Sequence, residues 1–511
     1  MKHPSVFEPF TFIVSIALAL VGIVIGLELL TRVGITPNTS IIGAIVAMGI
    51  ARVPIAHLAS FRSIARQNLL QTVISSATFG GANAVFLPLG VAWLVGGRDL
   101  VAPMLVGATL GMLIGGLTLY WLFDSPIYPA SASWPAGIAT AECLLAGDRG
   151  GQRARLLTAG GLIGGIGQAL GVPMDVVGVC WIGNAVALTM FGGGLLVRAY
   201  ARSWWDVEID RLYVPHGMMI GAGLIALWQI AQAFGGNADR AGPSRGYRSD
   251  LARALALNVA AAIVMATIAG LHAVMSYPML AVFILFAAVA ALASALIVGI
   301  AAMHAGWFPA FATALIFLII GTLAGFPPAP LALLVGLTAS GGPAFADLGF
   351  DLKTGWIVRG AGADLELERE GRWQQLIAAV LGFLVAVIFV WMVFDRYFAQ
   401  NLLPPADRVY AATIAAGANR DVLLRLILWA VPGAMLQAAG GPARQAGVLF
   451  ATGLLIYNPA AGWTALAALA IRLIAERRFG EQAQGPMYVL AGGFLAGSAL
   501  VSFGTATLKS R

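Results

Sequence analysis

The stretch PFTFIVSIALALVGIVIGLELL, residues 9–30, decides the fold class of this chain. A helix that spans a bilayer needs about 20 consecutive, mostly apolar residues, and this run is long enough. Lys2 and the small-residue pattern Ala17-Leu18-Ala19 would also suit a secretory signal, whose apolar core is shorter. Because the run continues to Leu30, we expect a retained first transmembrane helix.

The composition extends this expectation to the whole chain. Of 511 residues, 59% are hydrophobic and 10% are charged, whereas soluble domains have roughly 45–50% and 25%. The 63 glycines suit helices that associate in lipid through close packing of small residues. The apolar runs predict an all-α polytopic membrane protein with roughly 14 to 17 transmembrane or re-entrant helices.

The chain is also predicted to consist of two related halves. The polar stretch GGNADRAGPSRGYRSD (235–250) suits an exposed linker between a first half, residues 1–234, and a second half, residues 251–511. Three matches recur in the same order in both halves: QALGVP (168–173) with QAAGGP (437–442), Asn184 and Arg198 with Asn458 and Arg472, and Tyr213-Val214 with Tyr488-Val489. Such a duplication is typical of transporters, which place their site between two repeats at broken helices.

Several functional classes lack support in the sequence. The motifs HExxH, GxxxxGK[ST] and paired CxxC are absent, and the glycine cluster GGLIGGIG (160–167) suits helix packing. Cys143 and Cys180 lie in apolar segments, and no group of Cys, His and carboxylate residues suits a protein-held metal. The arginines between apolar runs are topology signals rather than a nucleic-acid surface. We therefore expect no enzyme activity, cofactor, resident metal or nucleic-acid partner.

The segment RQNLLQT (66–72) places polar groups within an apolar run. Asn68, Gln71 and Thr72 follow helical spacings of three and four, so they share one helix face. They would contact a substrate, or they would form hydrogen bonds between helices.

The segment FADLGFDLKTGWIVRG (345–360) carries Asp347, Asp351 and Lys353 between apolar runs. A charge at membrane depth costs about 2.5–3.5 kcal/mol on insertion scales, so such groups pair, face a cavity or act in transport. The alternative is an interfacial loop in which the charges are solvated.

A third segment, WPAGIATAECLLAG (134–147), places Glu142 inside a helix that Pro135 would begin. A half-helix that begins in the membrane offers free N–H groups to an anionic ligand, and its carboxylate could carry a proton. The alternative is a structural pair between Glu142 and an arginine. His216, after Tyr213-Val214-Pro215 at another predicted helix start, is a weaker candidate.

Together these segments resemble the oligopeptide transporter superfamily, which includes the yellow-stripe-like carriers of metal chelates. PAGIATAE (135–142) is similar to the family segment P-S-G-T-A-T-A-E, FDLKTGW (350–356) resembles Q-D-x-K-T-G-aromatic, and RQNLLQT resembles an early Q-N-x-x-Q-T helix. The resemblance covers roughly residues 10 to 505. Ala136 replaces the Ser of the first segment, and Ala496-Gly497-Ser498 stands where many relatives have A-G-E.

The resemblance implies a secondary active transporter, coupled to protons by symport. It would move short oligopeptides or peptide-like metal chelates across a prokaryotic cytoplasmic (inner) membrane. We expect Glu142 and Asp351 to carry a proton or to contact a charge on the ligand, and Lys353 to bind a carboxylate of the substrate. We expect Asn68, Gln71 and Thr72 to form hydrogen bonds with the substrate. Asn184 and Asn458 are expected at equivalent helix breaks, and His216 and Thr354 are further candidates. The alternatives are a passive channel and a membrane-embedded aspartyl enzyme using Asp347 and Asp351, and a homo-oligomer is compatible with the sequence.

Overall fold

The computed structural model describes residues 3–33, 39–53, 60–236, 247–306, 310–417, 420–442 and 444–508. These residues form helices joined by turns and loops, with one isolated bridge between Phe123 and Tyr128. The α-helices of the first half are α1 (Pro9–Val33), α2 (Thr39–Arg52), α3 (Ile64–Phe79), α4 (Leu87–Gly96), α5 (Arg98–Leu122), α6 (Pro135–Arg149), α7 (Gly151–Ala169), α8 (Met174–Ile182), α9 (Ala185–Trp205) and α10 (Val214–Gly236).

The remaining α-helices follow after residue 246. They are α11 (Tyr247–Ile268), α12 (Tyr277–Ala305), α13 (Ala310–Leu323), α14 (Pro328–Val358), α15 (Leu365–Ala399), α16 (Pro405–Ala416), α17 (Arg420–Gly440), α18 (Ala446–Leu455), α19 (Pro459–Phe479) and α20 (Gln484–Leu508). Short segments of other helix types are η2 (Gly80–Phe86), η3 (Leu271–Ala273) and η4 (Gly480–Ala483), of which η2 is a π-helix that joins α3 to α4.

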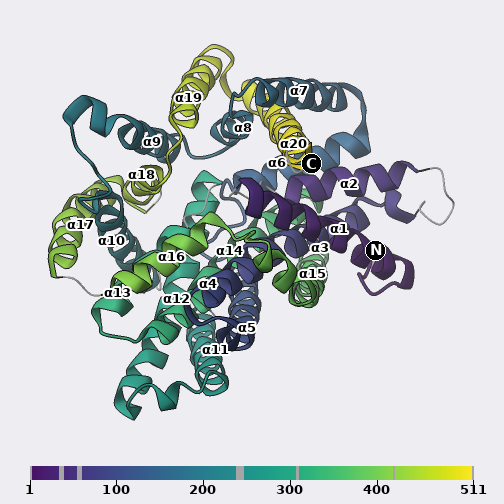
Figure 1. The fold of residues 1–511 in the computed structure, drawn as a ribbon. Helices are drawn as coiled ribbons and strands as arrows, with labels where there is room; N and C mark the ends of the chain where they lie inside the picture. The colour runs from purple at the N-terminus through teal and green to yellow at the C-terminus, as the bar shows by residue number, and fades with distance from the viewer. Residues whose placement is uncertain are drawn as a thin grey trace.

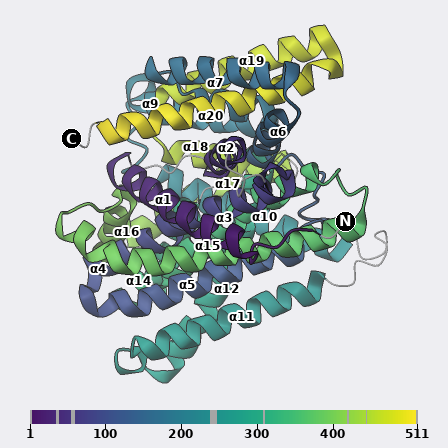
Figure 2. The ribbon, with the colours of Figure 1, turned by 90° about the vertical axis from the view of Figure 1, so that its right-hand side faces the viewer.

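Nine helical segments in the described part of the chain are long and apolar enough to cross a membrane. Shorter apolar helices, among them α13 and α18, lie between them. Figure 2 shows the long helices running along a common direction, with α11 at one edge and α7, α19 and α20 at the other. The predicted all-α polytopic membrane fold is confirmed, and α14 is its most enclosed span.

The two halves repeat the same succession of helices. α2 and α13 have 14 residues each, α6 and α16 both begin with a Pro-Ala pair, and α7 to α10 follow the same order of long and short helices as α17 to α20. The packing is reciprocal, because α7 lies along α20 while α17 lies along α10 (Figure 1). The predicted relationship between the halves is confirmed, although residues 237–246 of the predicted linker lie outside the described residues.

Two glutamines from the matched segments occupy equivalent places in the two halves. Gln168 Oε1 accepts a hydrogen bond of 3.3 Å from the backbone N–H of Met174, at the start of α8. Gln437 Oε1 accepts one of 3.1 Å from Gly447 N–H, at the start of α18. Each side chain thus satisfies a free N–H group at the start of the short helix that follows it.

Glycines permit the closest helix contacts, as the sequence predicts for the cluster at 160–167. A Cβ atom on Gly164 of α7 would lie 2.6 Å from Phe494 Cα of α20, and one on Gly493 would lie 2.7 Å from Gly160 Cα. Real Cβ atoms essentially never approach so closely. These glycines therefore form a packing face, as is common where helices associate in lipid.

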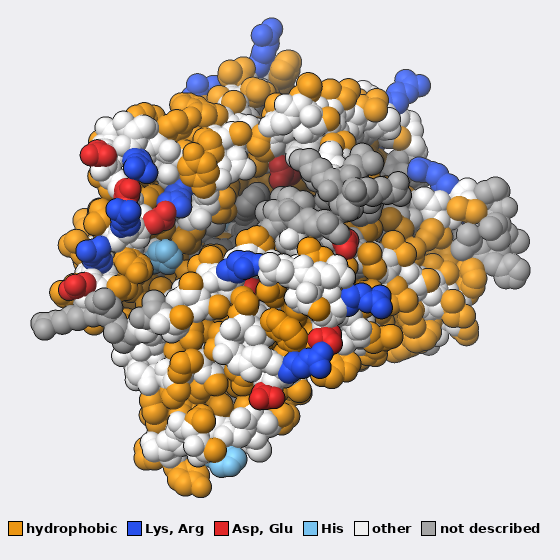
Figure 3. Space-filling view, viewed as in Figure 1, with side chains coloured by type: hydrophobic (Ala, Val, Ile, Leu, Met, Phe, Trp, Pro, Cys, Tyr) orange, Lys and Arg blue, Asp and Glu red, His pale blue; other side chains and the backbone are white. Residues whose placement is uncertain are grey.

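Hydrophobic side chains cover much of the face of the molecule that Figure 3 shows. Examples with more than half of their area exposed are Leu162, Ile166, Ile388, Met392, Leu428 and Ile474. A soluble protein rarely exposes so many large apolar groups. This surface suits contact with lipid chains in an integral membrane protein.

Candidate functional site

The candidate site is centred on two aspartates of α14. Pro327 and Pro328 stand at the start of this helix. A proline is tolerated there, because the first backbone N–H groups of a helix have no hydrogen-bond partner within the helix. Asp347 and Asp351 follow four residues apart, so they lie one turn apart on the same face. Both side chains are buried, with 3% and 0% of their area exposed. The interpretation of this segment as an interfacial loop is wrong, because it is the enclosed end of a spanning helix.

Serine and glutamine side chains from α2 and α3 contact the two carboxylates. Ser75 Oγ donates a hydrogen bond of 2.8 Å to Asp347 Oδ1. Ser40 Oγ donates one of 2.9 Å to Asp351 Oδ1, and Gln71 Nε2 donates to the same oxygen. The two serine oxygens are 2.9 Å apart. The hydrogen-bond donors to the aspartate pair are therefore neutral side chains from two other helices.

Among the described residues, the second oxygen of each aspartate has no hydrogen-bond partner. Asp347 Oδ2 and Asp351 Oδ2 are both buried, and no ion pair within the described residues involves either aspartate. A buried carboxylate without a cationic partner costs several kcal/mol, and two neighbouring carboxylates repel each other. The geometry thus favours binding of a proton or another cation at this pair.

The other polar residues of RQNLLQT lie beside the aspartates. Asn68 Nδ2 donates to Gln71 Oε1 at 3.1 Å, which orients the Gln71 amide toward α14. Thr72 Oγ1 accepts a hydrogen bond of 3.2 Å from Gln375 Nε2 of α15. All three predicted residues of α3 are buried and belong to one polar network with Asp351.

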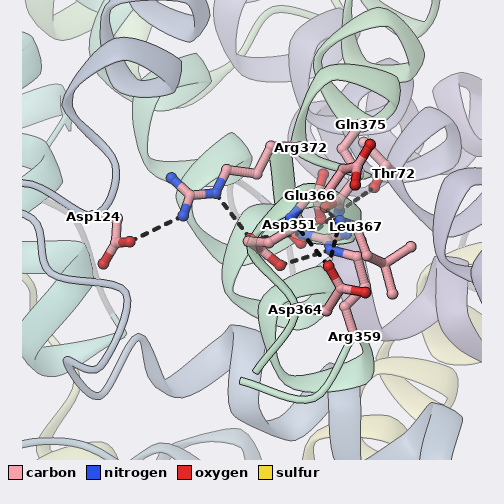
Figure 4. Close-up of polar contacts among 10 residues, drawn as sticks. Thr72, Asp124, Asp351, Arg359, Asp364, Glu366, Leu367, Arg372 and Gln375 are labelled. Carbon is pink, nitrogen blue, oxygen red and sulfur yellow. Dashed lines mark hydrogen bonds and ion pairs between the residues drawn. The ribbon is translucent and has the colours of Figure 1, made fainter. Parts of the chain in front are cut away.

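Gln375 connects the aspartate pair to a cluster of ion pairs, drawn in Figure 4. Its Nε2 donates to the backbone carbonyl of Asp351 at 2.7 Å, and its Oε1 accepts from Arg359 Nη1 at 2.8 Å. Arg359 also forms a two-pronged pair with Glu368, at 2.8 and 3.0 Å. Only 4% and 3% of these two side chains are exposed, so the charges are held in a largely water-free place.

Arg372 extends the cluster to the loop before α6. Its Nε lies 2.8 Å from Glu368 Oε1, and its Nη2 lies 3.0 Å from Asp124 Oδ2. Figure 4 shows Arg372 reaching from α15 toward Asp124 on that loop. The end of α14, the start of α15 and the loop after α5 are therefore held together by charge-assisted hydrogen bonds.

Lys353 and Thr354 of the D-x-K-T-G segment face α6 and the loop before it. Lys353 Nζ donates to the Ala130 carbonyl at 2.7 Å and lies 4.4 Å from the centre of the Trp356 ring. Thr354 Oγ1 lies 3.1 Å from the Gly137 carbonyl oxygen. A Cβ atom on Gly137 would lie 2.7 Å from Lys353 Cβ, so this glycine lets α6 cross α14 closely.

The other predicted residues lie on other helices. Glu142 is 3.6 Å from Arg153 of α7, which is the structural pair considered as its alternative. Asn184 and Asn458 accept backbone N–H groups at the starts of α9 and α19, as helix-capping residues do. His216 lies in the first turn of α10, with its ring 5.9 Å from that of Tyr213.

Sequence reasoning missed Ser40, Ser75 and Gln375 as members of the site. Ser75 had a detectable signal, since it follows Gln71 by four residues on the same face of α3. Gln375 lies in the charged first part of α15, and Ser40 lies in the first turn of α2, so neither had one.

Comparison with known proteins agrees with this architecture. No curated protein matches the chain at a significant level. The family model described as OPT oligopeptide transporter protein matches residues 9–235 and 249–509, which is nearly the whole chain and both halves. This protein therefore belongs to the OPT oligopeptide transporter family, whose members are membrane transporters.

Proposed function

We propose that this protein is a proton-coupled secondary active transporter of short oligopeptides or peptide-like metal chelates in a prokaryotic cytoplasmic membrane. Membership of the family supports a membrane oligopeptide transporter. The observation that carries the coupling is the buried pair Asp347 and Asp351, which has four carboxylate oxygens and no cationic partner among the described residues. A proton bound to this pair would remove most of its electrostatic cost.

The position of the pair supports a role in transport. α14 packs against α3 and α5 of the first half and α12 of the second. Transporters commonly bind substrate and coupling ion between their repeats, where the halves move relative to each other. A change of protonation at Asp351 would alter its contacts with α2 and α3, and so would affect how the helices pack.

The same geometry gives less support to an aspartyl enzyme. Asp347 and Asp351 lie on one helix, and each has one oxygen bound by a serine or glutamine. Paired catalytic aspartates instead usually come from facing elements and share one proton. A transporter uses such a pair without chemistry on its substrate.

Uptake into proteoliposomes tests the proposal. The wild-type protein is given a mixed pool of short peptides or, separately, ferric chelates, with and without an inward proton gradient, and the contents are measured by mass spectrometry. We expect one cargo to accumulate against its gradient only when protons flow inward. Equal uptake under both conditions would contradict proton coupling, and rapid, non-saturating uptake would indicate a channel.

Charge-neutralising variants test the aspartate pair. Asp347→Asn and Asp351→Asn should each abolish gradient-driven accumulation, because neither amide can carry the proton. Asp395→Asn is the matched control, since Asp395 is exposed on α15 and pairs with Arg98 at the surface. Normal accumulation by Asp351→Asn would contradict the assignment.

A further inference from the structure

The two serines between the aspartates form a continuous string of oxygen atoms. Asp347 Oδ1 is 2.8 Å from Ser75 Oγ, Ser75 Oγ is 2.9 Å from Ser40 Oγ, and Ser40 Oγ is 2.9 Å from Asp351 Oδ1. All four residues are buried. Each separation is within the range of an O–H···O hydrogen bond.

The number of protons in this string decides its chemistry. Three oxygen–oxygen contacts need three protons, but the two serine hydroxyls supply only two. The third proton must be on a carboxyl group, at one end of the string or the other. With one proton added to the pair, every contact becomes a hydrogen bond and one aspartate stays charged.

We propose that Ser40 and Ser75 are a proton relay between Asp351 and Asp347, an inference that rests on the proposed proton coupling. In the first state Asp351 Oδ1–H donates to Ser40, Ser40 donates to Ser75, and Ser75 donates to Asp347. In the transfer each O–H bond breaks as the next forms, and Asp347 Oδ1 gains the proton that Ser75 releases. Asp351 becomes the carboxylate, both serines remain neutral hydroxyls, and all three hydrogen bonds reverse direction.

The surroundings hold the string in place without neutralising it. A Cβ atom on Gly43 of α2 would lie 2.9 Å from the Gln71 carbonyl oxygen, so this glycine allows α2 to approach α3 and place Ser40 at the aspartates. Gln71 Nε2 donates to Asp351 Oδ1 and stabilises the charged state at that end. The relay is therefore intact only while α2 is packed on α3.

Several charged groups near the string have other partners, whereas Asp407 of α16 is buried and neither of its carboxylate oxygens has a hydrogen-bond partner among the described residues. Lys353 donates to the Ala130 carbonyl, and Arg359 pairs with Glu368. Glu142 of α6 lies by Arg153, and Arg52 of α2 donates to the Gly147 carbonyl. The proton on the aspartate pair is thus the positive charge that moves within the string.

The test compares proton-linked uptake with exchange of cargo across the same membrane. Proteoliposomes contain a pH-sensitive dye, and the cargo is the mixed pool of short peptides. Ser75→Ala and Ser40→Ala should each lower proton-linked uptake by about tenfold or more, while exchange of labelled for unlabelled peptide without a gradient falls less than about twofold. Ser75→Thr keeps a hydroxyl and should restore the uptake.

Ser76→Ala is the matched control, because Ser76 is the next residue of α3 and is buried, and its hydroxyl has no hydrogen-bond partner in the part of the chain that the structure describes. It should leave both rates unchanged.

Proton-linked uptake by Ser75→Ala and Ser40→Ala equal to that of Ser76→Ala would overturn the relay while leaving the proposed function intact. An equal loss of uptake and exchange would also overturn it, since it would indicate a structural role. Wild-type uptake that is equal with and without the proton gradient would instead contradict the proposed proton coupling itself. Because the two serines lie on different helices, a folding defect in one variant leaves the other as an independent test.

Discussion

Gln71 on α3 donates a hydrogen bond to the carboxylate of Asp351 on α14, and the two residues are 280 positions apart in the chain. The contact joins the two halves at a buried charge. It also explains why two segments that each look merely polar in sequence form a single site.

The first prediction concerns this contact. Gln71→Ala removes a donor and should slow gradient-driven uptake several-fold. Gln71→Glu should be more harmful, because a third carboxylate beside Asp347 and Asp351 adds like-charge repulsion in a place with little water. Peptide uptake into proteoliposomes measures both. Gln400→Glu, at the exposed end of α15, is the control, and uptake by Gln71→Glu equal to this control would contradict the prediction.

The second prediction concerns the ion pairs around Glu368. Glu368→Gln leaves Arg359 and Arg372 without their shared carboxylate, and breaking a buried pair typically lowers the free energy of unfolding by about 3–5 kcal/mol. Thermal unfolding of the detergent-solubilised protein should show a clear drop in melting temperature. Asp395→Asn removes one partner of the exposed pair with Arg98 and should cost about 1 kcal/mol or less. Similar melting temperatures for the two variants would mean that the buried pair contributes no more than the exposed one.

The third prediction concerns the glycines between α7 and α20. Gly164→Ala places a methyl group against the Phe494 backbone, and overpacking of this kind costs about 1–3 kcal/mol. Gly485→Ala is the control, since a Cβ atom there would meet nothing within 4 Å. The yield of folded protein after mild heating measures the difference. A Gly164→Ala variant as stable as the control would show that the two helices can separate at little cost.

The fourth prediction concerns Lys353, which we propose binds the carboxylate of the substrate. Its ammonium has three N–H donors, and the structure assigns one hydrogen bond to the Ala130 carbonyl. Lys353→Gln should reduce the preference for peptides with a free C-terminal carboxylate over amidated ones by about tenfold. Competition between the two peptide forms during uptake measures this preference. An unchanged preference would assign Lys353 to packing of the loop before α6.

Part of the site could be predicted from the sequence. Asp347, Asp351 and Lys353 were recognisable because charges inside apolar segments are rare and costly, and Asn68, Gln71 and Thr72 because their spacing places them on one face. Glu142 was recognisable by the same reasoning, but the sequence could not decide between a ligand and a structural pair. The structure places it by Arg153.

The contacts between distant members of the site could not be predicted, even where a residue such as Ser75 shares a helix face with a predicted one. Ser40 lies 311 positions from Asp351, and Ser75 lies 272 positions from Asp347. Serines are common in membrane helices and often bond to their own backbone, so a serine in an apolar run gives no sign of its partner. The sequence likewise does not show that α2 approaches α3 closely at Gly43, or that α6 approaches α14 closely at Gly137.

The sequence by itself determined that the chain spans a membrane, that its two halves are related, and which charged residues lie within apolar helices. These properties depend on hydropathy, on helical periodicity and on repeated residues, all of which are local. Only the tertiary structure decided which donors meet Asp347 and Asp351, and that Glu142, Asn184 and Asn458 have other partners. The physical reason is that contacts between helices depend on the register and closeness of their crossings, which glycine packing and buried hydrogen bonds set together.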